Sequence, residues 1–120
     1  MKSDNVIQNK SLAFAIKIVH TYKLLQSSHE FVLSKQLLKS GTSVGANVEE
    51  AIGGQSKADF ISKLSIAYKE ARETLYWIRL LSATGFLSKE VSEDLISDAE
   101  EICRIIGKIQ VTTKTSIRNS

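Results

Sequence analysis

Apolar residues recur along most of the chain at steps of three and four, which is the period of an α-helix. Three short segments interrupt this recurrence, around Ser28, Gly53 and Gly85. The pattern therefore predicts four helices, over roughly residues 6–26, 29–52, 57–84 and 88–113. Because the connections are short, consecutive helices should run antiparallel. We expect an all-α, up-and-down four-helix bundle formed by residues 1–120 as one domain.

Each predicted helix has an apolar stripe that should face the core. The stripe of the second helix stays in phase across residues 40–45, so this helix is predicted to continue through its glycines. The third helix keeps a strict seven-residue repeat from Phe60 to Leu81, and the fourth has its stripe between Val91 and Ile109. The predicted core positions of the first helix are Leu12, Ala15, Ile16, Val19, Tyr22 and Leu25.

The third predicted helix has more apolar surface than one core requires. A helix that is apolar over most of its circumference is buried on more than one side. We therefore predict that this helix contacts a second copy of the chain in a homo-oligomer. The alternative is a monomer whose core wraps around the third helix. The predicted interface residues are Ile61, Tyr68, Leu75, Tyr76 and Trp77.

Composition narrows the class of protein. The chain has no proline, so no long helix is interrupted, and its one cysteine excludes an internal disulfide. We expect Cys103 to be a small core residue rather than a reactive thiol. The sequence has no signal-like segment and no apolar run long enough to span a membrane, which together predict a cytoplasmic protein.

Residues for catalysis or cofactor binding are not apparent. No glutamate has a histidine three residues later, the spacing typical of metal sites in helical bundles. His20 and His29 are expected to face solvent or to cap helices. Glu49 and Glu50 are adjacent, so they point about 100° apart around a helix and do not form one site. We predict no enzymatic activity, no metal and no cofactor.

Basic residues are the remaining candidates for a binding site. The net charge is +3, and residues 104–120 contain four bases and no acid, whereas residues 90–101 contain six acids and no base. Basic side chains at helical spacing can follow a nucleic-acid backbone, although a solvated helix face has the same pattern. The candidates are Lys35 and Lys39 on the second helix, and Lys69, Arg72 and Arg79 on the third.

The stretch KQLLKSGTSVGANVEEA (residues 35–51), with SKADFISKLSIA (56–67) and KEARET (69–74), resembles a bacterial four-helix bundle family. This family is encoded in 23S rRNA intervening sequences and was formerly labelled S23 ribosomal protein. Gly41 and Gly45 have the spacing that lets two helices approach closely. With these glycines, the resemblance makes Ser43, Asn47 and Glu50 structural signature positions.

The resemblance also implies a ring-like pentamer without enzymatic activity. A relative is the accessory variability determinant of diversity-generating retroelements, a basic pentamer that binds nucleic acid and partners a reverse transcriptase. Two hypotheses follow for this chain. It is either an oligomeric accessory protein that binds RNA or DNA, or a structural module whose partner is another protein.

Overall fold

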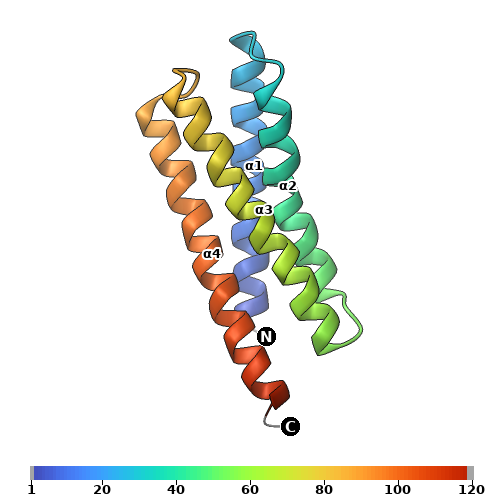
Figure 1. Ribbon diagram of the computed structural model, residues 1–120. Helices are drawn as coiled ribbons and strands as arrows, with labels where there is room; N and C mark the ends of the chain where they lie inside the picture. The colour runs from blue at the N-terminus through green and yellow to red at the C-terminus, as the bar shows by residue number, and fades with distance from the viewer. Residues whose placement is uncertain (1, 119–120) are drawn as a thin grey trace.

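Four antiparallel helices form the bundle that the sequence predicts. The computed structural model describes residues 2–118, and its helices are α1 (Lys2–Ser27), α2 (Leu33–Ile52), α3 (Lys57–Ala83) and α4 (Lys89–Arg118) (Figure 1). Each helix packs against the next one, and α1 also packs against α4. The Cα atoms extend over 53 × 21 × 19 Å. Within the described part of the chain, no helix is long and apolar enough to cross a membrane.

The turn between α1 and α2 explains why α2 begins at Leu33 and not at residue 29. His29 adopts a left-handed backbone conformation, with φ 63°, which ends the preceding helix. The Glu30 carboxylate then accepts hydrogen bonds from the backbone N–H groups of Val32, Leu33 and Ser34, at 3.2, 2.9 and 2.6 Å. These donors have no partner within the helix, so Glu30 acts as its N-terminal cap.

Glu30 itself is buried. Burial alone would raise the pKa of its carboxyl group, but the hydrogen bonds from Leu33, Ser34 and Val32 outweigh burial and hold the pKa below the ordinary value. Gln26 completes the network by donating to the Glu30 carbonyl and to Ser34 Oγ, at 3.2 and 2.8 Å. The conformation of the α1–α2 turn is therefore held by the hydrogen bonds of Glu30 and Gln26.

The other helix ends follow local rules. Ser56 caps α3 by accepting a hydrogen bond from the Asp59 N–H at 3.0 Å. Gly85 has φ 86° in the α3–α4 turn, a conformation that other residues rarely adopt. The fourth helix continues to Arg118, beyond the predicted end at residue 113, because Thr112 and Thr113 hydrogen-bond to their own helix backbone and Lys57 Nζ donates to Ser116 Oγ.

The predicted core face of α1 is correct at Leu25, which is buried, and wrong at Leu12 and Ile16. Leu12 is 60% exposed and Ile16 50% exposed, whereas Phe14 and Ile18 are buried. Helix α1 is apolar on two faces, and its buried face also contains the hydroxyl residues Ser11 and Thr21. Their hydroxyls donate to carbonyls of the same helix, so these polar residues are tolerated in the core. The predicted stripes of the other three helices are confirmed, and their central positions are buried.

The contact between α1 and α2 depends on the absence of a side chain at Gly41. A Cβ atom there would lie 2.7, 2.8 and 3.0 Å from three side-chain carbons of Ile18. At Gly45, a Cβ atom would lie 3.4 Å from the Ser11 carbonyl oxygen. The two glycines therefore set how closely the two helix backbones approach.

Candidate functional site

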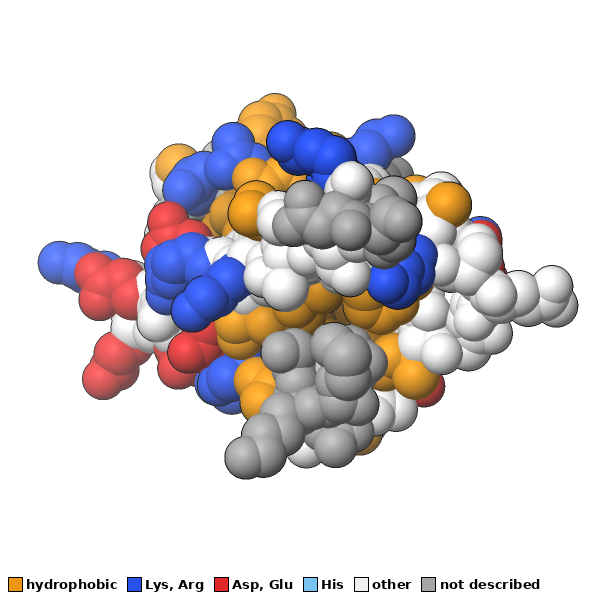
Figure 2. All heavy atoms as spheres, turned by 90° about the horizontal axis from the view of Figure 1, so that it is seen from below, with side chains coloured by type: hydrophobic (Ala, Val, Ile, Leu, Met, Phe, Trp, Pro, Cys, Tyr) orange, Lys and Arg blue, Asp and Glu red, His pale blue; other side chains and the backbone are white. Residues whose placement is uncertain are grey.

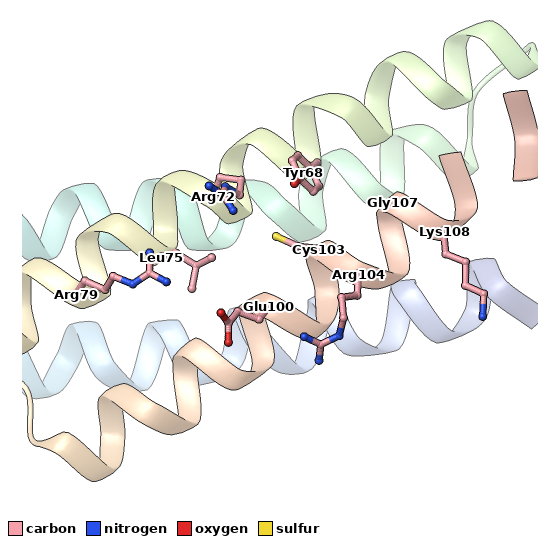
Figure 3. A pocket seen from close by; sticks show the side chains of 9 residues that line it. All are labelled: Tyr68, Arg72, Leu75, Arg79, Glu100, Cys103, Arg104, Gly107 and Lys108. Carbon is pink, nitrogen blue, oxygen red and sulfur yellow. The ribbon is translucent and has the colours of Figure 1, made fainter. Parts of the chain in front are cut away.

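A groove of about 380 Å³ runs along the boundary between α3 and α4 (Figure 3). Four of its lining residues lie on α3, namely Tyr68, Arg72, Leu75 and Arg79. Five lie on α4, namely Glu100, Cys103, Arg104, Gly107 and Lys108. Helices in contact leave a surface channel where small residues or long side chains border the seam, and here Gly107 and Cys103 are the small residues.

Helical periodicity brings four cations to this groove. Arg72 and Arg79 lie seven residues apart on α3, which places them two turns apart on the same face. Arg104 and Lys108 lie four residues apart on α4 and border the groove from the other side. Within residues 2–118, Glu100 is the one acidic side chain that lines it. The groove therefore has a surplus of positive charge.

Three other acids of α4 are paired with lysines of α1. Lys17 on α1 pairs with Asp94 at 2.9 Å and with Asp98 at 2.7 Å, and Lys10 pairs with Glu101 at 2.8 Å. The hydrogen bonds that Lys17 donates to Asp98 and Asp94 raise the pKa of Lys17, and the Lys10 ammonium lowers the pKa of Glu101. Three acids of α4 thus face α1, whereas Arg104 and Lys108 border the groove beside α3.

Positive charge continues beyond the groove toward the end of the bundle. In the view from below, lysine and arginine side chains surround the end where α3 begins and α4 finishes (Figure 2). In the sequence, residues 104–118 contain Arg104, Lys108, Lys114 and Arg118 without an acid. A polyanion lying in the groove would therefore meet further cations along α4.

The sequence predicts that Cys103 is a core residue. In the structure it is only half-buried and lies in the groove. Its sulfur points from α4 toward α3 (Figure 3). Burial raises the pKa of the Cys103 thiol, while the charges of Arg72 and Arg104 act to lower it and that of Glu100 to raise it. Arginines from both helices are therefore close enough to act on the same sulfur atom.

Gly107 opens the side of the groove formed by α4. It lies in the middle of a 30-residue helix, and no described atom lies within 4 Å of the position that its Cβ would occupy. Glycine in a helix interior costs about 1 kcal/mol relative to alanine. Neither close packing, as at Gly41, nor a left-handed backbone, as at Gly85, accounts for this glycine.

The five predicted basic candidates do not form one surface. Arg72 and Arg79 line the groove, whereas Lys69 is exposed on α3 outside it, and Lys35 and Lys39 are exposed on α2. The sequence prediction did not include two lining cations, Arg104 and Lys108. The run of bases after residue 103 was the available signal for them.

The predicted interface residues are also divided. Leu75 is 2% exposed and belongs to the core, so it offers little surface to another subunit, and Ile61 is half-buried. Tyr76 is 57% exposed, and its ring meets the half-buried Trp77 ring edge-on, with centroids 5.0 Å apart. Tyr68 is 37% exposed and borders the basic groove.

The signature residues of α2 serve several contacts. Gly41 and Gly45 face α1. Ser43 Oγ donates to the Lys39 carbonyl at 2.6 Å, and Asn47 Nδ2 donates to the Ser43 carbonyl at 2.8 Å, so both stabilise α2 itself. Glu50 is exposed and borders a hollow at the α2–α3 turn.

The structure gives no support for metal chemistry. No group of three histidine, cysteine or acidic residues in the described part of the chain is arranged to hold a metal ion. His20 is exposed on α1, and His29 is exposed in the α1–α2 turn, where its ring lies 5.9 Å from that of Phe31.

Comparison with known proteins identifies the family. Residues 3–108 match the profile of the family described as 23S rRNA-intervening sequence protein, and the chain belongs to that family. A crystal structure of a protein of unknown function from the S23 ribosomal protein family of Bacteroides thetaiotaomicron VPI-5482 is 50% identical. The alignment covers 90% of this chain and 97% of that one, with a TM-score of 0.88. No curated protein matches the chain.

Proposed function

We propose that this member of the 23S rRNA-intervening sequence protein family is a non-enzymatic, cytoplasmic protein that binds RNA or DNA through the α3–α4 groove. The observation that carries the proposal is that four cations from two helices, Arg72, Arg79, Arg104 and Lys108, line one groove that has a single acid. Arginine is the residue best suited to phosphate, because its planar guanidinium donates two parallel hydrogen bonds.

Binding through phosphates has a specific salt dependence. Each phosphate contact releases condensed counterions, so affinity falls as salt concentration rises. Four contacts to a single strand predict a slope of log K against log salt of about −3, since each contributes about 0.7. The +3 net charge of the whole chain understates this attraction, because Asp94 and Asp98 of α4 are paired with Lys17 of α1.

A charge-reversal experiment tests the proposal. Fluorescence anisotropy with labelled RNA and DNA oligonucleotides is measured at low salt for Arg72→Glu/Arg104→Glu. The matched control is Lys23→Glu/Lys89→Glu, which changes the net charge equally at two exposed positions outside the groove. We expect the groove variant to lose about tenfold or more in affinity and the control to change little. Equal losses in the two variants, or no binding by the wild type, would refute the proposal.

The basic residues of α2 could contact a nucleic acid that extends beyond the groove, and this contact is tested separately. Lys35 and Lys39 lie on one face of α2 and border no groove cation. A Lys35→Glu/Lys39→Glu variant therefore measures whether a long nucleic acid also reaches α2. A loss confined to long oligonucleotides would place α2 on the path of the strand, whereas no loss would restrict binding to the groove.

A second candidate function, assembly with other protein chains, is favoured by two exposed apolar patches. Leu12 and Ile16, one turn apart, form one on α1, and Tyr76 with the half-buried Trp77 ring against it forms the other on α3. These helices do not contact each other, so the patches face away from each other on diagonally opposite helices. Two different patches on opposite sides suit a head-to-tail ring of identical chains, such as the pentamer that the family resemblance implies.

Native mass spectrometry tests this assembly, with Leu12→Glu/Ile16→Glu as the disrupting variant. We expect a closed oligomer for the wild type and smaller species for the variant, while a wild-type monomer would exclude the ring. A partner of another kind, such as a reverse transcriptase, would then be sought by copurification. If copurification finds a protein partner and anisotropy finds no nucleic-acid binding, the chain is a protein-interaction module.

A further inference from the structure

We infer that the α3–α4 groove selects single-stranded over double-stranded nucleic acid by accepting an unpaired base between Tyr68 and Gly107. This inference rests on the proposed function, because it assigns the form of nucleic acid that the same groove binds. Arg72 and Arg104 contact the phosphates on either side of the inserted base. Three observations carry it, namely the shape of the groove, the glycine at its edge and the aromatic residue beside its cations.

The groove is a shallow hollow that is open to solvent along the seam of α3 and α4. Its volume of about 380 Å³ is sufficient for one face and edge of a base to lie in it. A duplex stacks its bases inside and presents its phosphates outside, so it can reach the cations but does not fill the hollow. An unpaired base can be turned out of the strand and placed in a protein pocket. The hollow therefore adds contacts for a single strand and none for a duplex.

Gly107 supplies the space for the base. Alanine at this position would favour the helix and would meet no described atom within 4 Å. The structure therefore contains a helix-weakening residue at a groove position where folding does not require it. The consequence of its missing side chain is an open patch of α4 backbone, across from α3, against which a flat group can lie (Figure 3).

Tyr68 supplies the stacking surface. Its ring borders the groove and is partly exposed, and Arg72 lies one helical turn away on the same side of α3. An aromatic ring beside cations is the arrangement by which proteins bind single strands without sequence preference. These groups fit a nucleotide better than an inorganic anion.

Two pairs of variants test the inference without changing charge. Gly107→Leu fills the groove, and Gly107→Ala is its control for helix propensity. Tyr68→Leu removes the ring, and Tyr68→Phe keeps it. Anisotropy is measured for an oligouridine, an oligothymidine and a duplex of equal length at one salt concentration. Circular dichroism and thermal melting confirm that each variant is folded.

We expect Gly107→Leu and Tyr68→Leu each to lose at least about fivefold in affinity for the single strands, with duplex binding unchanged. Tyr68→Phe should retain wild-type affinity. If both Leu variants bind single strands as tightly as the wild type, or if the wild type prefers the duplex, the inference is wrong. Failure of Arg72→Glu/Arg104→Glu to weaken any binding would instead reject the proposed function, so the two failures are distinguishable.

Discussion

Replacing each of two mid-helix glycines by alanine should change stability in opposite directions. Gly41 on α2 and Gly107 on α4 receive the same chemical change and the same gain in helix propensity, about 1 kcal/mol. At Gly107 the new methyl group meets no described atom within 4 Å, so the gain is realised. At Gly41 the methyl group would overlap three carbons of Ile18.

The overlap at Gly41 determines the sign of its effect. Two of the three carbons, at 2.7 and 2.8 Å, are attached directly to Cβ of Ile18, so the whole side chain must move. Ile18 is 0% exposed and has no space to move into. Overpacking of this kind typically costs about 1–3 kcal/mol. After subtraction of the propensity gain, we expect Gly41→Ala to destabilise the protein by about 1 kcal/mol or more.

Thermal and urea unfolding measure the difference at a fixed protein concentration, since assembly would make the midpoint depend on concentration. Because the propensity gain is common to both variants, we expect them to differ by the cost of the overlap, about 2 kcal/mol, or about 8 °C in Tm for a chain of this length. In the double variant Gly41→Ala/Ile18→Ala the overlap is absent, so its destabilisation should be smaller than the sum of the single effects by about 1 kcal/mol or more.

One result would refute this reasoning. If Gly41→Ala stabilises the protein as much as Gly107→Ala does, the backbones of α1 and α2 are not held together by the glycine contact. An additive double variant would lead to the same conclusion. The predicted close approach of the two helices, and the register of α1 that follows from it, would then need revision.

Three further predictions concern buried and paired polar groups. Glu30→Gln should destabilise the protein by about 1 kcal/mol at neutral pH, because a charged cap is replaced by a neutral one. Folding lowers the pKa of Glu30. The carboxylate therefore contributes fully to the free energy of unfolding above its unfolded-state pKa near 4.5, and this contribution is lost as the pH falls through the folded-state pKa. The Tm difference between wild type and variant should therefore shrink in acid, and a constant difference would contradict the cap. Thr74→Val should cost about 1–3 kcal/mol by urea unfolding, because it removes the buried hydroxyl that lies 2.9 Å from Ser40 Oγ, and a neutral result would contradict this. Lys17→Met should change stability by less than about 1 kcal/mol, because its ion pairs are solvent-exposed, and a larger loss at high salt would show that they are not screened.

The sequence was sufficient to predict the fold because the main apolar stripe of three of the four helices is the face that packs in the core. Helix α1 shows the limit of this reasoning. It has two apolar rows, and hydrophobicity alone favours the row with Leu12 and Ile16. The structure buries the row with Phe14 and Ile18, since the small residues Ser11 and Gly41 allow close packing on α2. Which row of α1 is buried depends on how well it fits the surface of α2, so the sequence of α1 alone does not predict it.

The groove was predictable in part. Arg72 and Arg79 were found from their spacing on one helix, because helical periodicity is readable from sequence. Their neighbours Arg104 and Lys108 were not, since the pairing of α3 with α4 and their relative register place these residues opposite each other. Gly107 lacks a sequence signal altogether. Its significance depends on the open space beside it, which is known only once the neighbouring helix is in place.

Cys103 allows the binding groove to be tested directly, because it is the only cysteine in the chain and lies in the groove. The rate at which iodoacetamide alkylates it is measured with and without a single-stranded oligonucleotide. Mildly alkaline pH is used, since burial raises the pKa of the thiol. If nucleic acid occupies the groove, alkylation slows in proportion to occupancy, by about tenfold at a ligand concentration near ten times Kd. An unchanged alkylation rate at saturating oligonucleotide would contradict binding in the α3–α4 groove.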